Sequence, residues 1–185
     1  LDGVVKDGAI FATNTSGLAI QDLNQAVSPA RRPQFIGMHF FSPANVMKLV
    51  EIIIGPETAE ETIAAIEDVC SRAGKATVRA KDAPGKDGFI ANRILMPMIN
   101  EAIRALDEGV GSATDIDMVM TLGMSHPIGP LRLADLIGLD VCVAIMDVLA
   151  RDLGAAPYAP PSNLRALVSE AGIGGQRVQG VASYT

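Results

Sequence analysis

Residues 35–54 read FIGMHFFSPANVMKLVEIII, and this stretch decides the fold. Residues 35–38 and 49–54 are short apolar runs, of the kind that form β-strands buried inside a sheet. The segment between them contains Pro43, which is typical of a turn. The stretch therefore predicts two neighbouring strands joined by a short connection.

Two polar residues interrupt this apolar stretch. His39 follows the first strand, and Glu51 lies inside the second strand, twelve positions later. A buried carboxylate is unfavourable unless it is paired, and His39 on the neighbouring strand is its natural partner. Such a pair holds the imidazole in one orientation and favours its protonated form, which makes His39 a candidate general base. The alternative is a structural core histidine beside a glutamate at a wet edge of the sheet.

Upstream of this stretch, residues 9–13 form another short apolar run. Residues 14–17 follow it and offer N-cap side chains to a helix predicted over residues 18–27. Amides and hydroxyls at the end of a strand also bind polar groups of ligands, so Asn14 and Ser16 are candidate binding residues. Plain helix capping is the alternative.

Downstream, Thr58 and Glu61 have the spacing of a capping box and predict the start of a helix. Gly74 suits the position just after the end of that helix, and residues 76–80 predict a last strand. The alternation of strands and helices over residues 1–80 predicts an α/β unit with a mainly parallel sheet.

The composition changes at residues 81–88, and beyond them the strand signals almost vanish. Residues 89–106 carry an apolar stripe at helical spacing, with a kink expected at Pro97. Residues 131–153 predict a long apolar helix or helix pair that is interrupted near Gly138. Its apolar face is wide enough to include a subunit interface. The second part of the chain is therefore predicted to be all-α.

Two polar residues of this helical part are further candidates. Asn92, in the first turn of the first helix, faces either a cleft between the domains or solvent. His126, in the rigid turn before Pro127, is better explained as a structural residue. The sequence has no Cys/His spacing of a metal site, no phosphate-binding loop and no nucleophile elbow. No metal is expected.

The composition limits the classes of function. Fifteen Lys and Arg stand against 21 Asp and Glu, giving a net charge of −6, which argues against nucleic-acid binding. A hydrophobic content of 49% excludes a disordered chain. No apolar stretch is long enough for a membrane span. Cys70 and Cys142 lie in apolar helical patterns, which predicts buried free thiols and a reducing, cytoplasmic location.

Five motifs occur in a recognisable order: ATNTS at 12–16, IGMHFFSP at 36–43, VMKLVE at 46–51, GFIANRIL at 88–95 and HPIGPL at 126–131. Together they resemble the 3-hydroxyacyl-CoA dehydrogenase family, with bacterial 3-hydroxybutyryl-CoA dehydrogenases as the nearest members. The resemblance extends to about residue 172.

The resemblance implies an α/β fold followed by an all-α fold. Residues 1–82 would be the C-terminal part of a Rossmann-like NAD-binding domain, and residues 83–185 a helical domain for substrate binding and dimerisation. The implied reaction oxidises a (3S)-3-hydroxyacyl-CoA, with a short chain such as 3-hydroxybutyryl-CoA, to the 3-ketoacyl-CoA. The cofactor would be NAD or NADP, and the protein a cytoplasmic homodimer without nucleic-acid or membrane partners.

The resemblance also implies roles for single residues. His39 would remove the hydroxyl proton, while Glu51 would orient His39 and stabilise its imidazolium. Ser16 would contact the reacting oxygen or the nicotinamide region, and Asn92 would hold polar groups of the substrate. The expected cofactor-binding residues are Asn14, Ser16 and Ser42.

The sequence departs from the family pattern at several points. It has no glycine-rich phosphate-binding turn and no acidic residue for the ribose, so the chain beginning at Leu1 is expected to be an N-terminally truncated protein, inactive by itself. Residues 86–88 resemble an insertion, and Ser42 stands where many members carry Asn. The family's closing tail is not recognised beyond Gly172.

Two other functions remain open at this point. Without the phosphate-binding turn, this polypeptide would serve as a non-catalytic helical dimerisation or binding module. A related hydroxyacid dehydrogenase would share the pair of His39 and Glu51 and differ in its substrate.

Overall fold

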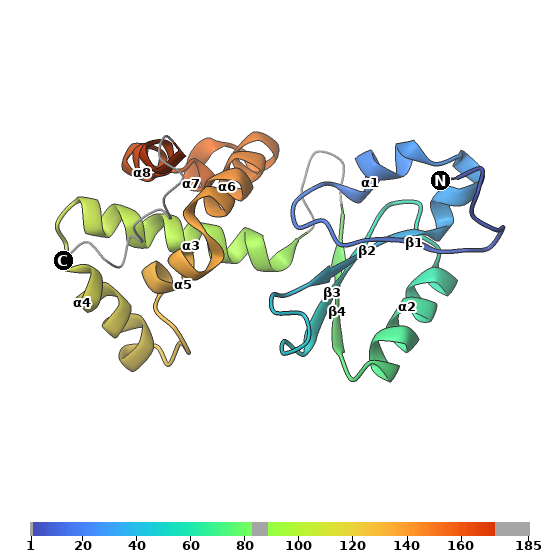
Figure 1. Ribbon diagram of the computed structural model, residues 1–185, viewed down its shortest axis with the longest axis horizontal. Coiled ribbons are helices and arrows are strands. Elements are labelled where there is room, and N and C mark those ends of the chain that lie inside the picture. Colours follow the sequence, from blue (N-terminus) through green and yellow to red (C-terminus); the bar gives the residue numbers. More distant parts are fainter. Residues whose placement is uncertain (1, 83–88, 173–185) are drawn as a thin grey trace. The chain divides into compact units, whose positions relative to one another are not determined.

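The structure of the chain is a computed structural model, which describes residues 2–82 and 89–172 (Figure 1). The chain divides into two compact units, Leu1–Ile90 and Ala91–Thr185. The predicted domain boundary between residues 82 and 83 stays a prediction, because residues 83–88 are outside the described part. The predicted insertion at residues 86–88 and the tail beyond Gly172 are also outside it.

The first unit contains a sheet of four strands in the order β1-β2-β3-β4. The strands are β1 (Phe11–Thr13), β2 (Phe35–Phe40), β3 (Leu49–Ile54) and β4 (Ala76–Lys81). β1 and β2 are parallel, as are β3 and β4, whereas β2 and β3 are antiparallel. A parallel pairing of β2 and β3 would need a crossover of about a dozen residues or more, and residues 41–48 are too few. The strands and their mainly parallel arrangement match the prediction.

Helices cover both faces of this sheet (Figure 1). The helix α2 (Glu60–Arg72) packs Ile63 and Ile66 on one face, against the side chains of Ile36 and Ile52. The short helix α1 (Ile20–Leu23) and Val27, which follows the 3₁₀ turn Asn24–Ala26, pack on the other face. A second 3₁₀ turn, Pro29–Gln34, leads into β2. Because side chains alternate along a strand, His39 shares this second face with Phe35, and Glu51 shares it with Ile53.

The starts of the two helices differ from the prediction. Ala59, not Thr58, is the N-cap of α2, and no side chain caps it. The Thr58 hydroxyl instead donates to the Phe35 carbonyl at 2.8 Å and accepts from the Gly55 amide at 3.0 Å. The predicted capping box is therefore wrong, because Thr58 joins this loop to the start of β2. The predicted end is confirmed, since Gly74 follows α2 with a φ of +69°.

The helix predicted over residues 18–27 is also shorter than expected. α1 begins after Ala19, and no side chain of residues 14–17 caps it. The buried Asp82 carboxylate, at the end of β4, instead accepts a hydrogen bond from the Gln21 amide at 3.0 Å. A distant carboxylate thus supplies the favourable negative charge at the start of this helix.

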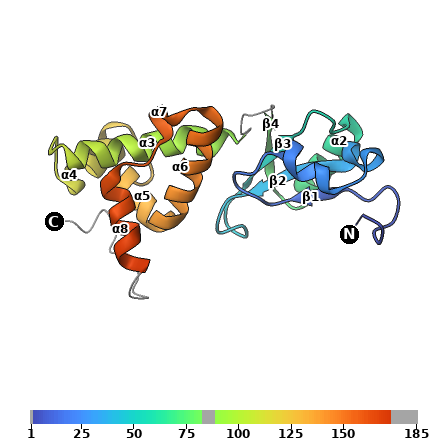
Figure 2. The same cartoon turned by 90° about the horizontal axis from the view of Figure 1, so that it is seen from above.

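Among its described residues, the second unit contains only helices, as predicted. They are α3 (Ile90–Asp107, whose first residue belongs to the first unit), α4 (Ala113–Met118) with a π-helical continuation at Val119–Gly123, α5 (Pro130–Ile137), α6 (Leu139–Leu153), α7 (Ala155–Tyr158) and α8 (Ser162–Gly172). α5, α6 and α8 gather around α3 (Figures 1 and 2), and their apolar side chains form one core. The break between α5 and α6 lies at Gly138, which has a φ of +105°.

The apolar residues over 131–149 contribute much of this core, although Leu136 and Val141 on the same segment are 75% and 43% exposed. Leu131, Met146 and Leu149 are completely buried, and Leu139 is 2% exposed. The expectation that part of this face is a subunit interface stays a prediction, because buried and exposed apolar residues both occur on this segment. Further exposed apolar residues lie on other segments, and they include Val110, Val119 and Leu122.

Other expectations concern single side chains. Cys70 and Cys142 are both free and buried, as predicted. Burial raises the pKa of the Cys142 thiol to about 12, so this thiol is protonated at neutral pH. Within residues 2–82 and 89–172, no helix is long and apolar enough to cross a membrane. The same residues contain no group of three or more His, Cys, Asp or Glu that could hold a metal ion.

Candidate active site

The antiparallel pair of β2 and β3 places His39 directly opposite Glu51. His39 Nδ1 lies 3.0 Å from Glu51 Oε2. Both residues are buried, with exposed fractions of 6% and 1%. The contact that the sequence predicted is therefore present, and it lies on the face of the sheet that α1 covers.

Two aromatic rings enclose the imidazole. The Phe41 ring centroid is 5.0 Å from that of His39, and the Phe89 ring meets the imidazole edge-on at 5.2 Å. Phe89 is itself 1% exposed. Apolar walls of this kind lower the local dielectric, which strengthens the interaction between imidazole and carboxylate.

The other oxygen of Glu51 also has a partner. Oε1 accepts a hydrogen bond from the backbone amide of Ile90 at 2.6 Å. Ile90 is the first residue of α3, where backbone amides have no partner within the helix. Because a carboxylate only accepts hydrogen bonds, its contact with His39 assigns the ring hydrogen to Nδ1. Nε2 then has a lone pair with which it can accept a proton.

Polar residues collect where β1 and β2 end. The two strands are parallel, so their carboxyl ends lie at the same edge, where α/β sheets bind ligands. Asn14 Oδ1 accepts from the Phe40 amide at 3.0 Å and so joins the end of β1 to the residue after His39. Ser16 and Ser42 follow the two strands, and both are exposed, as is Asn14.

Asn92 lies in the other unit. It is in the first turn of α3 and is 7% exposed. The structure therefore brings together His39, Glu51 and Asn14 within the first unit. The proposed role of Asn92 towards a substrate stays a prediction.

Three contributors to this site were not found from the sequence. The Ile90 amide has no signal in the sequence, because nearly every residue has an amide. Phe89 looked like one member of an apolar helical stripe. Lys75, just beyond α2, donates from Nζ to the Ala44 carbonyl at 2.5 Å and to the Met47 carbonyl at 2.7 Å. It thereby holds the connection between β2 and β3, which contains Ser42.

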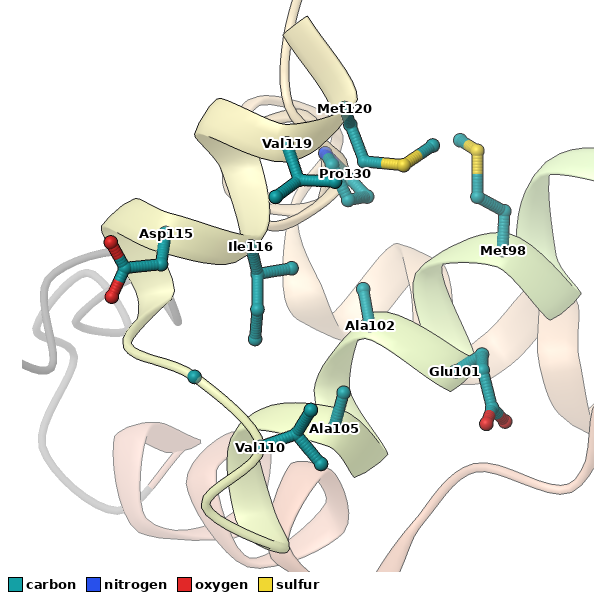
Figure 3. A pocket seen from close by; sticks show the side chains of 11 residues that line it. Met98, Glu101, Ala102, Ala105, Val110, Asp115, Ile116, Val119, Met120 and Pro130 are labelled. Atoms are coloured by element: carbon teal, nitrogen blue, oxygen red, sulfur yellow. The ribbon is translucent and has the colours of Figure 1, made fainter. Parts of the chain in front are cut away.

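A separate hollow of about 540 Å³ lies within the helical unit (Figure 3). Met98, Ala102 and Ala105 project into it from α3, and Ile116, Val119 and Met120 face them from α4 and its continuation. The carboxylates of Glu101 and Asp115 point away from it in Figure 3. Among the described residues, the lining of this hollow is therefore mainly apolar, and neither carboxylate is directed into it.

Comparison with known proteins matches the two parts of the chain to two domains of one protein family. Residues 1–83 match the family model described as "3-hydroxyacyl-CoA dehydrogenase, NAD binding domain", and residues 88–184 match "3-hydroxyacyl-CoA dehydrogenase, C-terminal domain". The second match continues beyond Gly172, so the expected loss of resemblance in the tail is wrong.

Two curated relatives named 3-hydroxybutyryl-CoA dehydrogenase match the whole chain. The protein of Clostridioides difficile is 42% identical over 184 residues, and that of Bradyrhizobium diazoefficiens is 43% identical over 184 residues. The chain spans 64% and 61% of their lengths.

A solved structure confirms the fold. The crystal structure of (S)-3-hydroxybutyryl-CoA dehydrogenase from Ralstonia eutropha superposes with a TM-score of 0.85 at 46% sequence identity. The match covers 92% of this chain and 58% of that chain. The chain therefore belongs to the 3-hydroxyacyl-CoA dehydrogenase family.

Proposed function

We propose that this chain carries the catalytic base of an NAD-dependent (3S)-3-hydroxyacyl-CoA dehydrogenase, with 3-hydroxybutyryl-CoA as substrate. The observation that supports the proposal best is the buried pair of His39 and Glu51 beside the ligand-binding edge of the sheet. The choice of 3-hydroxybutyryl-CoA as substrate is supported by the relatives that are named 3-hydroxybutyryl-CoA dehydrogenase. In this proposal residues 1–82 serve the cofactor, and residues 83–185 serve the substrate and subunit association.

The proposed proton acceptor is Nε2 of His39. The O–H bond of the substrate's 3-hydroxyl breaks, its proton moves to Nε2, and the carbon–oxygen double bond forms as the C3–H bond breaks. NAD, when bound, accepts the hydride from C3. Glu51 then lies 3.0 Å from an imidazolium, and the opposite charges stabilise each other in this apolar surrounding.

The polar residues at the strand ends fit the nicotinamide end of NAD. Asn14 uses its carbonyl oxygen for the Phe40 amide, and its exposed side-chain nitrogen remains able to donate to a ligand. Ser16 and Ser42 add hydroxyl groups at the same edge. The sequence has no G-x-G-x-x-G turn for the pyrophosphate, so these residues account for one end of the cofactor only. We assign Asn92 to the polar groups of the substrate.

Steady-state kinetics of the full-length enzyme with 3-hydroxybutyryl-CoA and NAD test this proposal. His39→Gln should lower kcat by about 10²–10⁴-fold, the range for loss of a general base. His126→Gln is the matched control, because His126 is the other histidine of the chain and lies in a turn of the helical unit. Equal rates in the wild type and His39→Gln would exclude His39 as the base.

We also propose that the helical unit associates with a second copy through the apolar hollow of Figure 3. Val110 and Val119, which line it, are 74% and 59% exposed, and burying such surface favours association. Val119→Asp should convert a dimer into a monomer in sedimentation velocity. Val141→Asp is the control, since Val141 is exposed on α6 and does not line the hollow.

We propose a cytoplasmic location, which agrees with the free thiols of Cys70 and Cys142.

A further inference from the structure

Glu51 contacts two different parts of the chain through its two carboxylate oxygens. Oε2 lies 3.0 Å from His39 Nδ1, and Oε1 accepts from the Ile90 amide at 2.6 Å. His39 belongs to the neighbouring strand, whereas Ile90 begins α3, the helix that leads into the second unit. The carboxylate therefore joins the imidazole to the first residue of this helix.

A glutamate needs such a second contact if it is to orient a histidine. The terminal torsion of its side chain has no narrow minimum, so a carboxylate held through one oxygen alone can rotate. A hydrogen bond to an ionised acceptor is about twice as strong as one between neutral groups. At 1% exposure, Glu51 has almost no access to water that could replace a lost partner.

We propose that the Ile90 amide is a positioning group of the active site, which directs Glu51 Oε2 at His39. This inference rests on the proposed function. Its consequence is that the base is correctly oriented only when the first residue of α3 lies against Glu51. This hydrogen bond lies within the first unit, to which Ile90 belongs.

Proline at position 90 removes this amide hydrogen. Proline has no amide hydrogen and is favoured at the first position of a helix, so Ile90→Pro is compatible with α3. The Ile90 side chain is 43% exposed and is not part of the core. Alanine at the same position restores the amide, so Ile90→Ala is the conservative variant. Ser162→Pro, at the exposed first position of α8, is the control for proline at a helix start.

The full-length enzyme is assayed with 3-hydroxybutyryl-CoA and NAD. Ile90→Pro should lower kcat by about tenfold or more, the effect of one lost charge-assisted hydrogen bond, with unchanged KM for both substrates. Ile90→Ala should restore kcat, and Ser162→Pro should match the wild type. In a Glu51→Gln background, Ile90→Pro should cause no further loss, because the amide acts through Glu51. A wild-type kcat in Ile90→Pro, an additive double variant, or a parallel rise in KM would each overturn the inference.

Nuclear magnetic resonance provides a second readout that does not need turnover. The imidazole nitrogen and Nδ1 proton signals of His39 should move in Ile90→Pro and keep their wild-type positions in Ile90→Ala. In Glu51→Gln, the Ile90 amide proton should shift upfield. Unmoved signals would overturn the inference even if the enzyme acts on another substrate. If Ile90→Pro does not fold, the chemical shift of the Ile90 amide proton in Glu51→Gln still tests the inference, and an unchanged shift would overturn it.

Discussion

Gly129 lies against the carboxyl group of Asp117, so closely that a Cβ at position 129 would be 2.2 Å from Asp117 Cγ. The same carboxylate accepts hydrogen bonds from the amides of Leu131 at 2.9 Å and Arg132 at 3.0 Å. These amides belong to the first turn of α5. Asp117, at the end of α4, therefore caps the next helix, and Gly129 leaves the room that this cap requires.

Gly129→Ala should destabilise the helical unit by displacing this cap. Loss of a capping carboxylate costs about 0.5–2 kcal/mol, and displacement of a tightly packed carboxylate adds to it. The midpoint of thermal unfolding, followed by circular dichroism, should fall. Gly123→Ala is the control, because a Cβ at position 123 would meet no atom within 4 Å. Equal midpoints for the two variants would contradict the assignment of Asp117 as the cap.

A pH-dependent contribution to stability is expected from Arg79 on β4. Its guanidinium donates to both Glu67 oxygens, at 2.7 and 2.8 Å, and these hydrogen bonds lower the pKa of Glu67 from its ordinary 4.5. A lowered folded-state pKa stabilises the protein above pH 4.5, and the contribution disappears as the pH falls through the folded-state value. The gain is small because the pair is on the surface.

Thermal unfolding of Arg79→Gln and the wild type should therefore differ at pH 7 and converge in strong acid. Arg72→Gln serves as the comparison, because Arg72 forms a single exposed ion pair with Asp68. A difference between Arg79→Gln and wild type that grows as the pH falls below 4 would contradict this account.

The contact between His39 and Glu51 could be predicted from the sequence because each residue is a polar interruption in an apolar run. The starts of the helices α1 and α2 could not be predicted, since they depend on hydrogen-bonding groups that are distant in the sequence. The Thr58 hydroxyl donates to the Phe35 carbonyl and does not cap α2, and Asp82 accepts from the amide of Gln21, 61 residues earlier, in the first turn of α1. The spacing of residues along the chain cannot reveal such contacts, because a side chain that could cap its own helix can instead form a hydrogen bond with a distant backbone group.

The helix α3 shows a second limit of the sequence pattern. The helix is present and its Ile99 and Ala102 are buried, but the apolar Ile94 is 68% exposed. Met96 and Ile103 are also buried, together with the polar Asn100. When apolar residues surround a helix on most sides, their spacing fixes the period and leaves the buried face undetermined.

Glu51→Gln should separate orientation of the base from substrate binding. Glutamine keeps the volume of Glu51 but removes the charge that stabilises the imidazolium. We expect kcat to fall by about 10–100-fold, less than for His39→Gln, with little change in either KM, because Glu51 acts through His39. Glu61→Gln, on the exposed side of α2, is the control. A larger loss of kcat in Glu51→Gln than in His39→Gln would indicate that Glu51, not His39, is the base.

Lys75→Met should weaken the binding of the cofactor. Lys75 holds the connection between β2 and β3 through the Ala44 and Met47 carbonyls, and Ser42 lies on this connection. Methionine keeps a long apolar side chain but cannot donate, so Ser42 should lose its fixed position while the buried pair of His39 and Glu51 remains. We expect a severalfold higher KM for NAD, since one or two hydrogen bonds of about 1 kcal/mol are lost, with a nearly unchanged KM for the acyl-CoA. Lys81→Met, at the exposed end of β4, is the control. An unchanged KM for NAD would show that this connection does not position Ser42 for the cofactor.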